Sequence, residues 1–224
     1  HAAENRDEVA WVRQLYPKAR SYLSVYERFG LLRPRAVYAH CIYIDDEDRA
    51  LLRDTGAGAA VSPTSNLFLG SGFFDYVGAD RAGFLYGLAS DVGGGTSFSP
   101  FHTMLAAYYV GREGQGKRGV SLGPQNLWWQ HTGGAARALG LDGVVGNLLP
   151  GCEADFVVLD PRATPLLARR TAQAGGLDEL LFALIVLGDD RVIERTVISQ
   201  AIQASGAHAV AFATPLSTDD SDLS

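Results

Sequence analysis

Short apolar runs alternate with amphipathic segments over the first 110 residues of the chain. Three runs are short, rich in small, β-branched and aromatic residues, and end at polar or glycine-rich positions. This pattern predicts buried β-strands. The three runs are RAVYAHC (35–41), AGAAVSP (57–63) and FLYGLASD (84–91).

The stretches around these runs carry helix-capping residues or helical periodicity. We expect helices over residues 5–15, 21–30, 45–56, 75–83 and 97–110. Residues 64–72 (TSNLFLGSG) are polar and glycine-containing, and they predict a loop. Strands that alternate with helices in this order predict the α/β class, with a parallel sheet covered by helices.

The pattern changes towards the C-terminus. Residues 116–141 predict mostly helix, and residues 146–161 (GNLLPGCEADFVVLDP) predict glycine and proline turns followed by an apolar strand. Residues 177–199 predict a helix, a turn and a final strand, and within them LGDDR (187–191) predicts a surface turn with an Asp–Arg pair. Residues 201–224 follow neither period and end in STDDSDLS, which predicts a disordered acidic tail.

Composition limits the kinds of partner and the cellular compartment that we expect for this chain. The 224-residue chain has a formal net charge of −6, which argues against nucleic acid or an anionic membrane as its main partner. No apolar run reaches the roughly 18–20 residues that span a bilayer. Cys41 and Cys152 are too few for a disulfide framework, so we expect a reducing, cytoplasmic setting.

Polar side chains with catalytic chemistry occur where predicted strands pass into loops. They are His1 with Glu4, His40 and Asp91. In α/β barrels the carboxyl ends of the strands supply the active site. Imidazole and carboxylate groups are zinc ligands, and a neighbouring carboxylate can transfer protons. The order of these residues therefore favours a metal-dependent hydrolytic site.

Each residue also has an ordinary explanation when it is taken alone. His40 suits a satisfied core histidine, and Asp91 suits a helix cap. Glu4 suits a first-turn carboxylate that the helix dipole favours, and His1 suits a chain end. Only their recurrence at successive strand ends favours a shared site.

Three motifs in this order resemble those of the guanine deaminase family in the amidohydrolase superfamily. They are HAAEN (1–5), YAHC (38–41) and SDVGGGTSFS (90–99). Residues 63–75, 132–160 and 181–193 resemble further family motifs, and the similarity extends from His1 to about Val197. The resemblance implies the C-terminal half of a (β/α)8 TIM-like barrel in residues 1–145. It also implies part of a small β-sandwich domain, with a returning helix, in residues 146–200.

The resemblance also implies roles for individual residues. His1 and Asp91 match metal ligands, with one zinc ion expected and iron as the other possibility. Glu4 matches the carboxylate that protonates the purine ring, and His40 the histidine that orients the hydrolytic water. Asp91 would also accept a proton from that water. The implied reaction converts guanine to xanthine and ammonia by attack of a zinc-bound hydroxide, in an enzyme that is a homodimer when full length.

Contacts with the substrate are less closely defined. Gly94 is expected to bind it, because small residues after the aspartate leave room for a flat purine, and Asn66 is expected to contact it as well. Tyr43 and Phe68 are further candidates, although Phe68 equally suits the core.

One family feature is missing from this sequence. No His-x-His pair occurs in the 224 residues, although relatives use such a pair as two further ligands. Because the chain starts on a predicted ligand, we expect it to be part of a longer enzyme. Alone it is expected to be inactive and, with an open strand edge, prone to aggregation. The alternatives are an amidohydrolase for another purine, a triazine or a pterin, and a non-catalytic half-barrel that acts through a partner.

Overall fold

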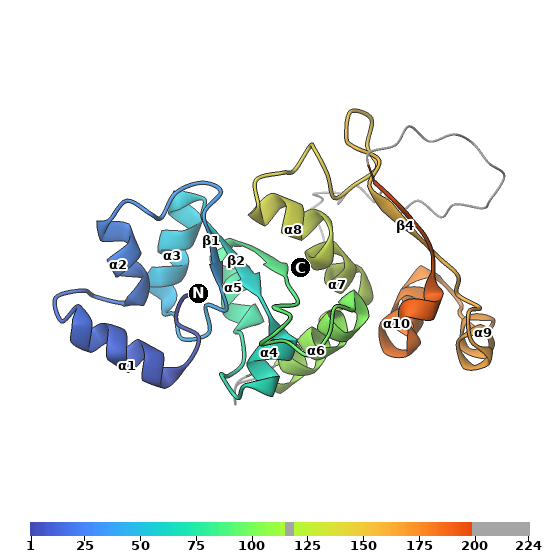
Figure 1. The fold of residues 1–224 in the computed structure, drawn as a ribbon, viewed down its shortest axis with the longest axis horizontal. Helices are drawn as coiled ribbons and strands as arrows, with labels where there is room; N and C mark the ends of the chain where they lie inside the picture. The colour runs from blue at the N-terminus through green and yellow to red at the C-terminus, as the bar shows by residue number, and fades with distance from the viewer. Residues whose placement is uncertain (115–118, 199–224) are drawn as a thin grey trace, which may run out of the picture.

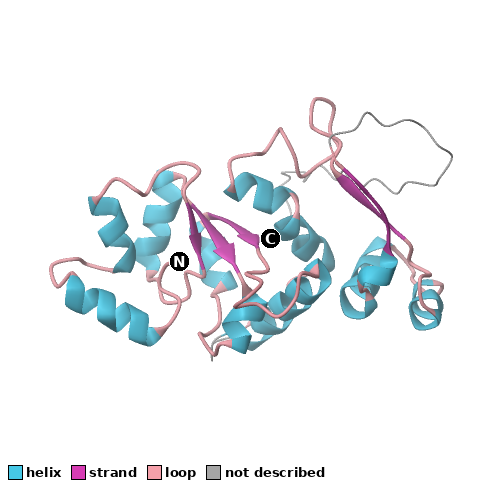
Figure 2. Cartoon of the chain, viewed as in Figure 1, coloured by secondary structure: helices cyan, strands magenta, loops and turns pink. Residues whose placement is uncertain are grey.

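Three parallel strands form the central sheet of the computed structural model, which describes residues 1–114 and 119–198 (Figures 1 and 2). They are β1 (Val37–Ala39), β2 (Gly58–Val61) and β3 (Leu85–Leu88), in the order β1-β2-β3. Ala2 forms an isolated parallel bridge with His40, so the first residues lie along the outer edge of β1. The three predicted strands and their parallel arrangement are thus confirmed.

Helices precede, connect and follow these strands. They are α1 (Arg6–Leu15), α2 (Tyr22–Arg28), α3 (Asp46–Thr55), α4 (Pro63–Phe68), α5 (Tyr76–Ala82) and α6 (Pro100–Glu113). Local chemistry sets several ends. Asp45 caps the N-terminus of α3 by accepting a hydrogen bond from the Asp48 amide, at 2.8 Å. Gly56 ends the same helix in the left-handed conformation, with φ of 68°, which glycine adopts without strain.

The loop predicted over residues 64–72 is wrong for its first half, because α4 covers Pro63–Phe68. Pro63 starts this helix, and its fixed φ suits the first helical turn. Thr64, Ser65 and Asn66 are all buried despite their polarity. Short-range propensity favours a loop here, but burial of these side chains against the rest of the fold makes the segment helical.

The helices after α6 pack against the sheet and against one another. Of the predicted helical stretch 116–141, residues 116–118 lie outside the described part. The remainder contains α7 (Pro124–His131) and α8 (Gly133–Ala138). Glycines in the strands allow α8 to approach closely, since a Cβ at Gly87 would lie 2.6 Å from the Ala135 Cα. Trp128 of α7 is a packing residue, with its ring edge-on to Phe101.

The last described elements form a separate small sheet at one end of the molecule (Figure 1). It pairs β4 (Phe156–Leu159) antiparallel with β5 (Ile193–Val197). Between them lie α9 (Pro165–Thr171), α10 (Leu177–Leu187) and a 3-10 turn, η2 (Asp190–Val192). The predicted Asp–Arg pair is confirmed as a salt bridge between Asp189 and Arg191.

The domain boundaries at residues 145 and 200 stay predictions. The predicted tail, residues 201–224, lies outside the described residues. Among the described residues, none of the helices combines the length and the apolar character needed to cross a membrane.

Candidate metal and catalytic site

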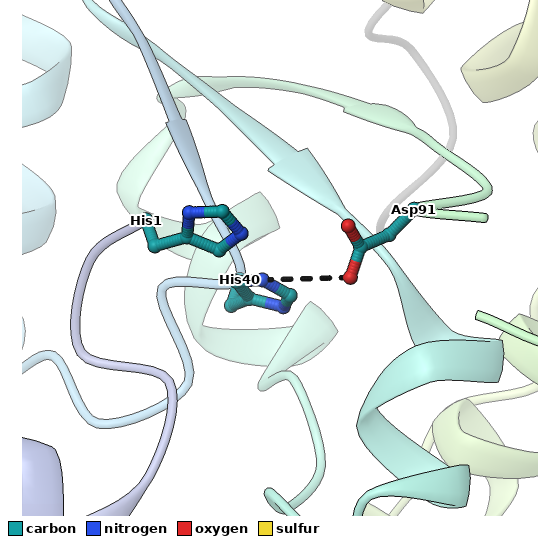
Figure 3. A group of neighbouring side chains, drawn as sticks. All are labelled: His1, His40 and Asp91. Atoms are coloured by element: carbon teal, nitrogen blue, oxygen red, sulfur yellow. Dashed lines mark ion pairs between the residues drawn. The ribbon is translucent and has the colours of Figure 1, made fainter. Parts of the chain in front are cut away.

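The strand ends bring the predicted site residues together at the carboxyl edge of the sheet. His40 directly follows β1, Asp91 lies three residues beyond β3, and His1 precedes the residue that bridges to His40. One ligand atom from each of these three side chains lies within 4.8 Å of the other two (Figure 3). The rings of His1 and His40 stack with their centroids 5.1 Å apart. The three side chains therefore converge on one point.

His40 is oriented by a hydrogen bond on the far side of its ring. Its Nδ1 lies 2.8 Å from Oδ1 of Asn66, and the whole residue is buried. Because an amide oxygen accepts, Nδ1 carries the proton and Nε2 presents a lone pair. Nε2 lies 3.7 Å from Oε2 of Glu4 and 3.8 Å from Oδ2 of Asp91, and it has no hydrogen-bond partner. A buried atom left unpaired in this way points to a missing ligand or water.

Glu4 reaches the same point from the chain start. Its backbone amide donates to Oε2 of Glu8, at 2.8 Å, within the capping interactions that begin α1. Its carboxylate accepts a hydrogen bond from the hydroxyl of Ser71, at 2.7 Å, through Oε1. The side chain is only 16% exposed, and Oε2 faces His40. Hydrogen bonds thus hold Glu4 at its backbone amide and at its carboxylate.

The backbone is left-handed at several site residues that are not glycine. His40, Cys41 and Asp91 have φ values of 70°, 48° and 48°. Such conformations cost about 1–3 kcal/mol each and tend to cluster at functional sites. At His40 the surrounding pairing holds the conformation, because the Cys41 amide donates to the Ala2 carbonyl at 3.0 Å. The strained turns direct both side chains toward the shared point.

Gly94 lies close to the carboxylate of Asp91. A Cβ on Gly94 would lie 2.9 Å from the Ser65 hydroxyl and 3.0 Å from Oδ2 of Asp91. The Gly95 amide donates back to the Asp91 carbonyl, which closes the turn. Gly94 therefore keeps the Asp91 carboxylate accessible, and its contact with a substrate stays a prediction.

The other predicted substrate contacts have different surroundings. The Asn66 oxygen bonds His40, and its amide nitrogen is buried without a partner. Tyr43 donates its hydroxyl to the Ser71 carbonyl, at 2.7 Å. Phe68 is 68% exposed and is therefore not a core residue. The substrate contacts of these three residues stay predictions.

The donor set fits a divalent metal ion. Two imidazoles and a carboxylate are the ligand types that zinc prefers, and iron shares them. The unpaired, buried Nε2 of His40 faces the same point and leaves a lone pair for a metal ion or a water molecule. Sequence analysis predicted His1 and Asp91 as ligands, and the structure places His40 within the same group.

Ser71 was missed by sequence reasoning. It lies in a family-like motif, residues 63–75, but no periodicity or charge pattern marks it. Only the tertiary fold shows that it meets Glu4, which is 67 residues away in the chain.

A groove of about 430 Å³ lies elsewhere, between α1, α2 and the start of α3. Tyr43 is the one predicted substrate contact that lines it, and none of the predicted catalytic or metal residues does so. Arg20 on its wall is already paired with Asp45 and Asp48. Burial raises the pKa of Asp48, although the Ser21 hydroxyl and Arg20 oppose that effect. The predicted metal and catalytic residues at the strand ends are therefore separate from this groove.

Comparison with known proteins agrees with the fold. Residues 1–206 match the model of the amidohydrolase family. A guanine deaminase from Escherichia coli (strain K12) is 41% identical over 198 residues, which are 88% of this chain and 44% of that protein.

Solved structures are similar over the same part. The structure of E. coli guanine deaminase superposes with a TM-score of 0.84 at 42% identity, over 89% of this chain and 46% of that one. A guanine deaminase from C. acetobutylicum with guanine in its active site gives 0.78 at 28% identity, with 89% and 46% covered. The chain thus spans less than half the length of these relatives. The predicted amidohydrolase fold and the resemblance to guanine deaminases are confirmed.

Proposed function

This chain belongs to the amidohydrolase family, and we propose that it is the C-terminal part of an enzyme that hydrolyses guanine to xanthine and ammonia. The observation that carries the proposal is the convergence of His1, His40 and Asp91 within 4.8 Å, with Glu4 beside them. These are the residue types that metal-assisted hydrolysis needs. The identity to guanine deaminases supports guanine as the substrate.

His1 and Asp91 would hold the metal ion, and His40 would act on the water beside it. Zinc is the proposed ion, because it accepts imidazole nitrogen and carboxylate oxygen in one site. When bound, such an ion supplies a water molecule whose pKa is lowered toward about 7.

Different residues of this chain would then carry out the separate proton transfers. His40 accepts a hydrogen bond from the attacking water through Nε2 and so orients it. Asp91 takes a proton from that water, and Glu4 delivers a proton to the ring nitrogen beside C2. The water oxygen bonds to C2, and the bond from C2 to the exocyclic amine breaks. One proton of the water leaves with the amine as ammonia, and the other replaces the proton that Glu4 gave to the ring nitrogen, which stays on the ring of xanthine. Water and guanine are thereby converted to xanthine and ammonia without any further reactant.

Positions for the purine are proposed on the same edge. Gly94 would let the flat ring approach Asp91, because a side chain there would meet both Ser65 and Asp91. Asn66 is proposed as a further contact through its unpaired amide nitrogen.

Full activity is proposed to need residues outside this chain. The sequence contains no His-x-His pair. With His40 assigned to the water, only His1 and Asp91 remain as ligands, fewer than the three protein ligands of a catalytic zinc site. We further propose a cytoplasmic enzyme that is a dimer when full length, with a small purine and no nucleic acid or membrane as its partner.

A substrate panel tests the proposal. The full-length protein, loaded with zinc, is assayed with guanine, other purines, a triazine and a pterin. Ammonia release from guanine with the highest kcat/KM is the expected result. If another ring is clearly preferred, the proposal of a hydrolytic site stands and the proposal of guanine as the substrate fails. No turnover of any of them by metal-loaded protein would favour a non-catalytic half-barrel.

A further inference from the structure

Ser71 holds the carboxylate of Glu4, and we propose that it is a positioning residue for proton transfer in this site. The inference rests on the proposed function, because it assigns Ser71 a part in the same reaction. Ser71 does not lie in the ligand group formed by His1, His40 and Asp91, so it would act only through Glu4.

The contact between the two residues is direct and protected. The Ser71 hydroxyl donates to Oε1 of Glu4 at 2.7 Å, and Ser71 is only 5% exposed. In the described part of the chain, Ser71 is the one side chain that donates a hydrogen bond to Glu4. Hydrogen bonds to an ionised carboxylate are among the strong ones. With Oε1 occupied, Oε2 is left to face His40 Nε2 at 3.7 Å.

Ser71 is itself held by three further features. Its amide donates to the Asn66 carbonyl at 2.9 Å, and its carbonyl accepts from the Tyr43 hydroxyl at 2.7 Å. Gly72 follows with φ of 138°, and a Cβ there would lie 2.7 Å from the Tyr43 oxygen. The turn therefore has a fixed shape that a residue other than glycine would disturb. A hydroxyl fixed in this way can select one orientation of a flexible glutamate.

The same segment contacts the other proton-handling residues. Asn66 of α4 bonds the ring of His40, and the Thr64 hydroxyl donates to the carbonyl of Ser90, next to Asp91, at 3.4 Å. Residues 63–72 thus act as one rigid support behind the site. Ser71 is the member of this support that reaches Glu4.

A structural role and a positioning role predict different kinetics. Loss of a merely structural hydroxyl lowers stability and leaves the turnover of the folded enzyme unchanged. Loss of a positioning hydroxyl lowers kcat, because the glutamate samples unproductive orientations, and leaves KM nearly unchanged. Small misplacements of a catalytic group reduce rates by up to about a hundredfold.

The test uses the full-length, zinc-loaded protein with Ser71→Ala. We expect kcat for guanine to fall roughly tenfold to a hundredfold, with KM within about threefold and zinc content unchanged. Adding Ser71→Ala to Glu4→Gln is expected to lower kcat by less than about twofold, because the residue it positions is already altered. Ser24→Ala is the matched control, since it removes a hydroxyl that only caps α2, and it should leave kcat unchanged.

A crystal structure of Ser71→Ala gives a second readout that does not depend on turnover. The Glu4 carboxylate is expected to leave its single orientation. If the wild-type protein does not turn over guanine, the proposed function fails, and this structure still decides the role of Ser71. The inference would be overturned if the Glu4 carboxylate keeps its orientation in the Ser71→Ala structure. It would also be overturned if Ser71→Ala lowers kcat by the same factor in the wild-type and Glu4→Gln backgrounds.

Discussion

The Nδ1 atom of His40 lies 2.8 Å from Oδ1 of Asn66, while Nε2 of the same ring faces the carboxylates of Glu4 and Asp91. The hydrogen bond selects the ring form with its lone pair toward the site. Second partners of this kind fix the orientation of a metal-site histidine and affect metal affinity or activity by about 10–100-fold. Asn66 is therefore expected to fix the orientation of the His40 ring.

Replacement of this amide should weaken both activity and stability. Asn66→Ala leaves a buried Nδ1–H without a partner, which costs about 1–3 kcal/mol of unfolding free energy. We expect kcat of the full-length enzyme to fall about 10–100-fold. Chemical denaturation and steady-state kinetics measure the two effects.

Leu67→Ala provides the matched control on the same helix. The Leu67 side chain is 43% exposed, so its loss should change neither quantity by much. Equal activity of Asn66→Ala and wild type would show that the orientation of His40 does not depend on this bond.

Gly94 should tolerate no side chain. In Gly94→Ala the new methyl group would lie 2.9 Å from the Ser65 hydroxyl and 3.0 Å from the Asp91 carboxylate, both closer than ordinary contact. We expect KM for guanine to rise by about tenfold or more, or turnover to be lost. Gly123→Ala is the control, because a Cβ at Gly123 meets nothing within 4 Å. An unchanged KM in Gly94→Ala would remove this glycine from the substrate surface.

The two cysteines should differ in reactivity. Burial raises the pKa of the Cys41 thiol to about 12, while Cys152 is partly exposed. Only the thiolate reacts, so at pH 8 Cys41 is far less reactive than an exposed thiol. We expect a disulfide reagent to modify one thiol of the native protein at pH 8, and both thiols after unfolding. Equal rates for both thiols in the native state would contradict the burial of Cys41.

Local patterns were sufficient to predict the sheet and the positions of His40 and Asp91 at the ends of its strands. The three strands are compact apolar runs with polar ends, and parallel strands place those ends on one edge. His40 and Asp91 could therefore be expected to meet. The helix at Pro63–Phe68 could not be predicted in this way, because its polar residues favour a loop and only tertiary burial makes the segment helical.

The supporting contacts were hidden for the same reason. Ser71 and Glu4 are 67 residues apart, and Asn66 and His40 are 26 apart. No periodicity connects such pairs, since they depend on how α4 and the following turn pack behind the strand ends. Long-range contacts of this kind decide the orientation of the site residues.

Metal content and guanine turnover, measured side by side, test the central claim most directly. One sample is this 224-residue chain, and the other is the polypeptide extended upstream to the length of the relatives. We expect about one zinc ion per extended chain and conversion of guanine to xanthine, with neither in the 224-residue chain. Removal of the metal by a chelator should abolish turnover, and added zinc should restore it. An extended protein that binds no metal and leaves guanine unchanged would contradict the account.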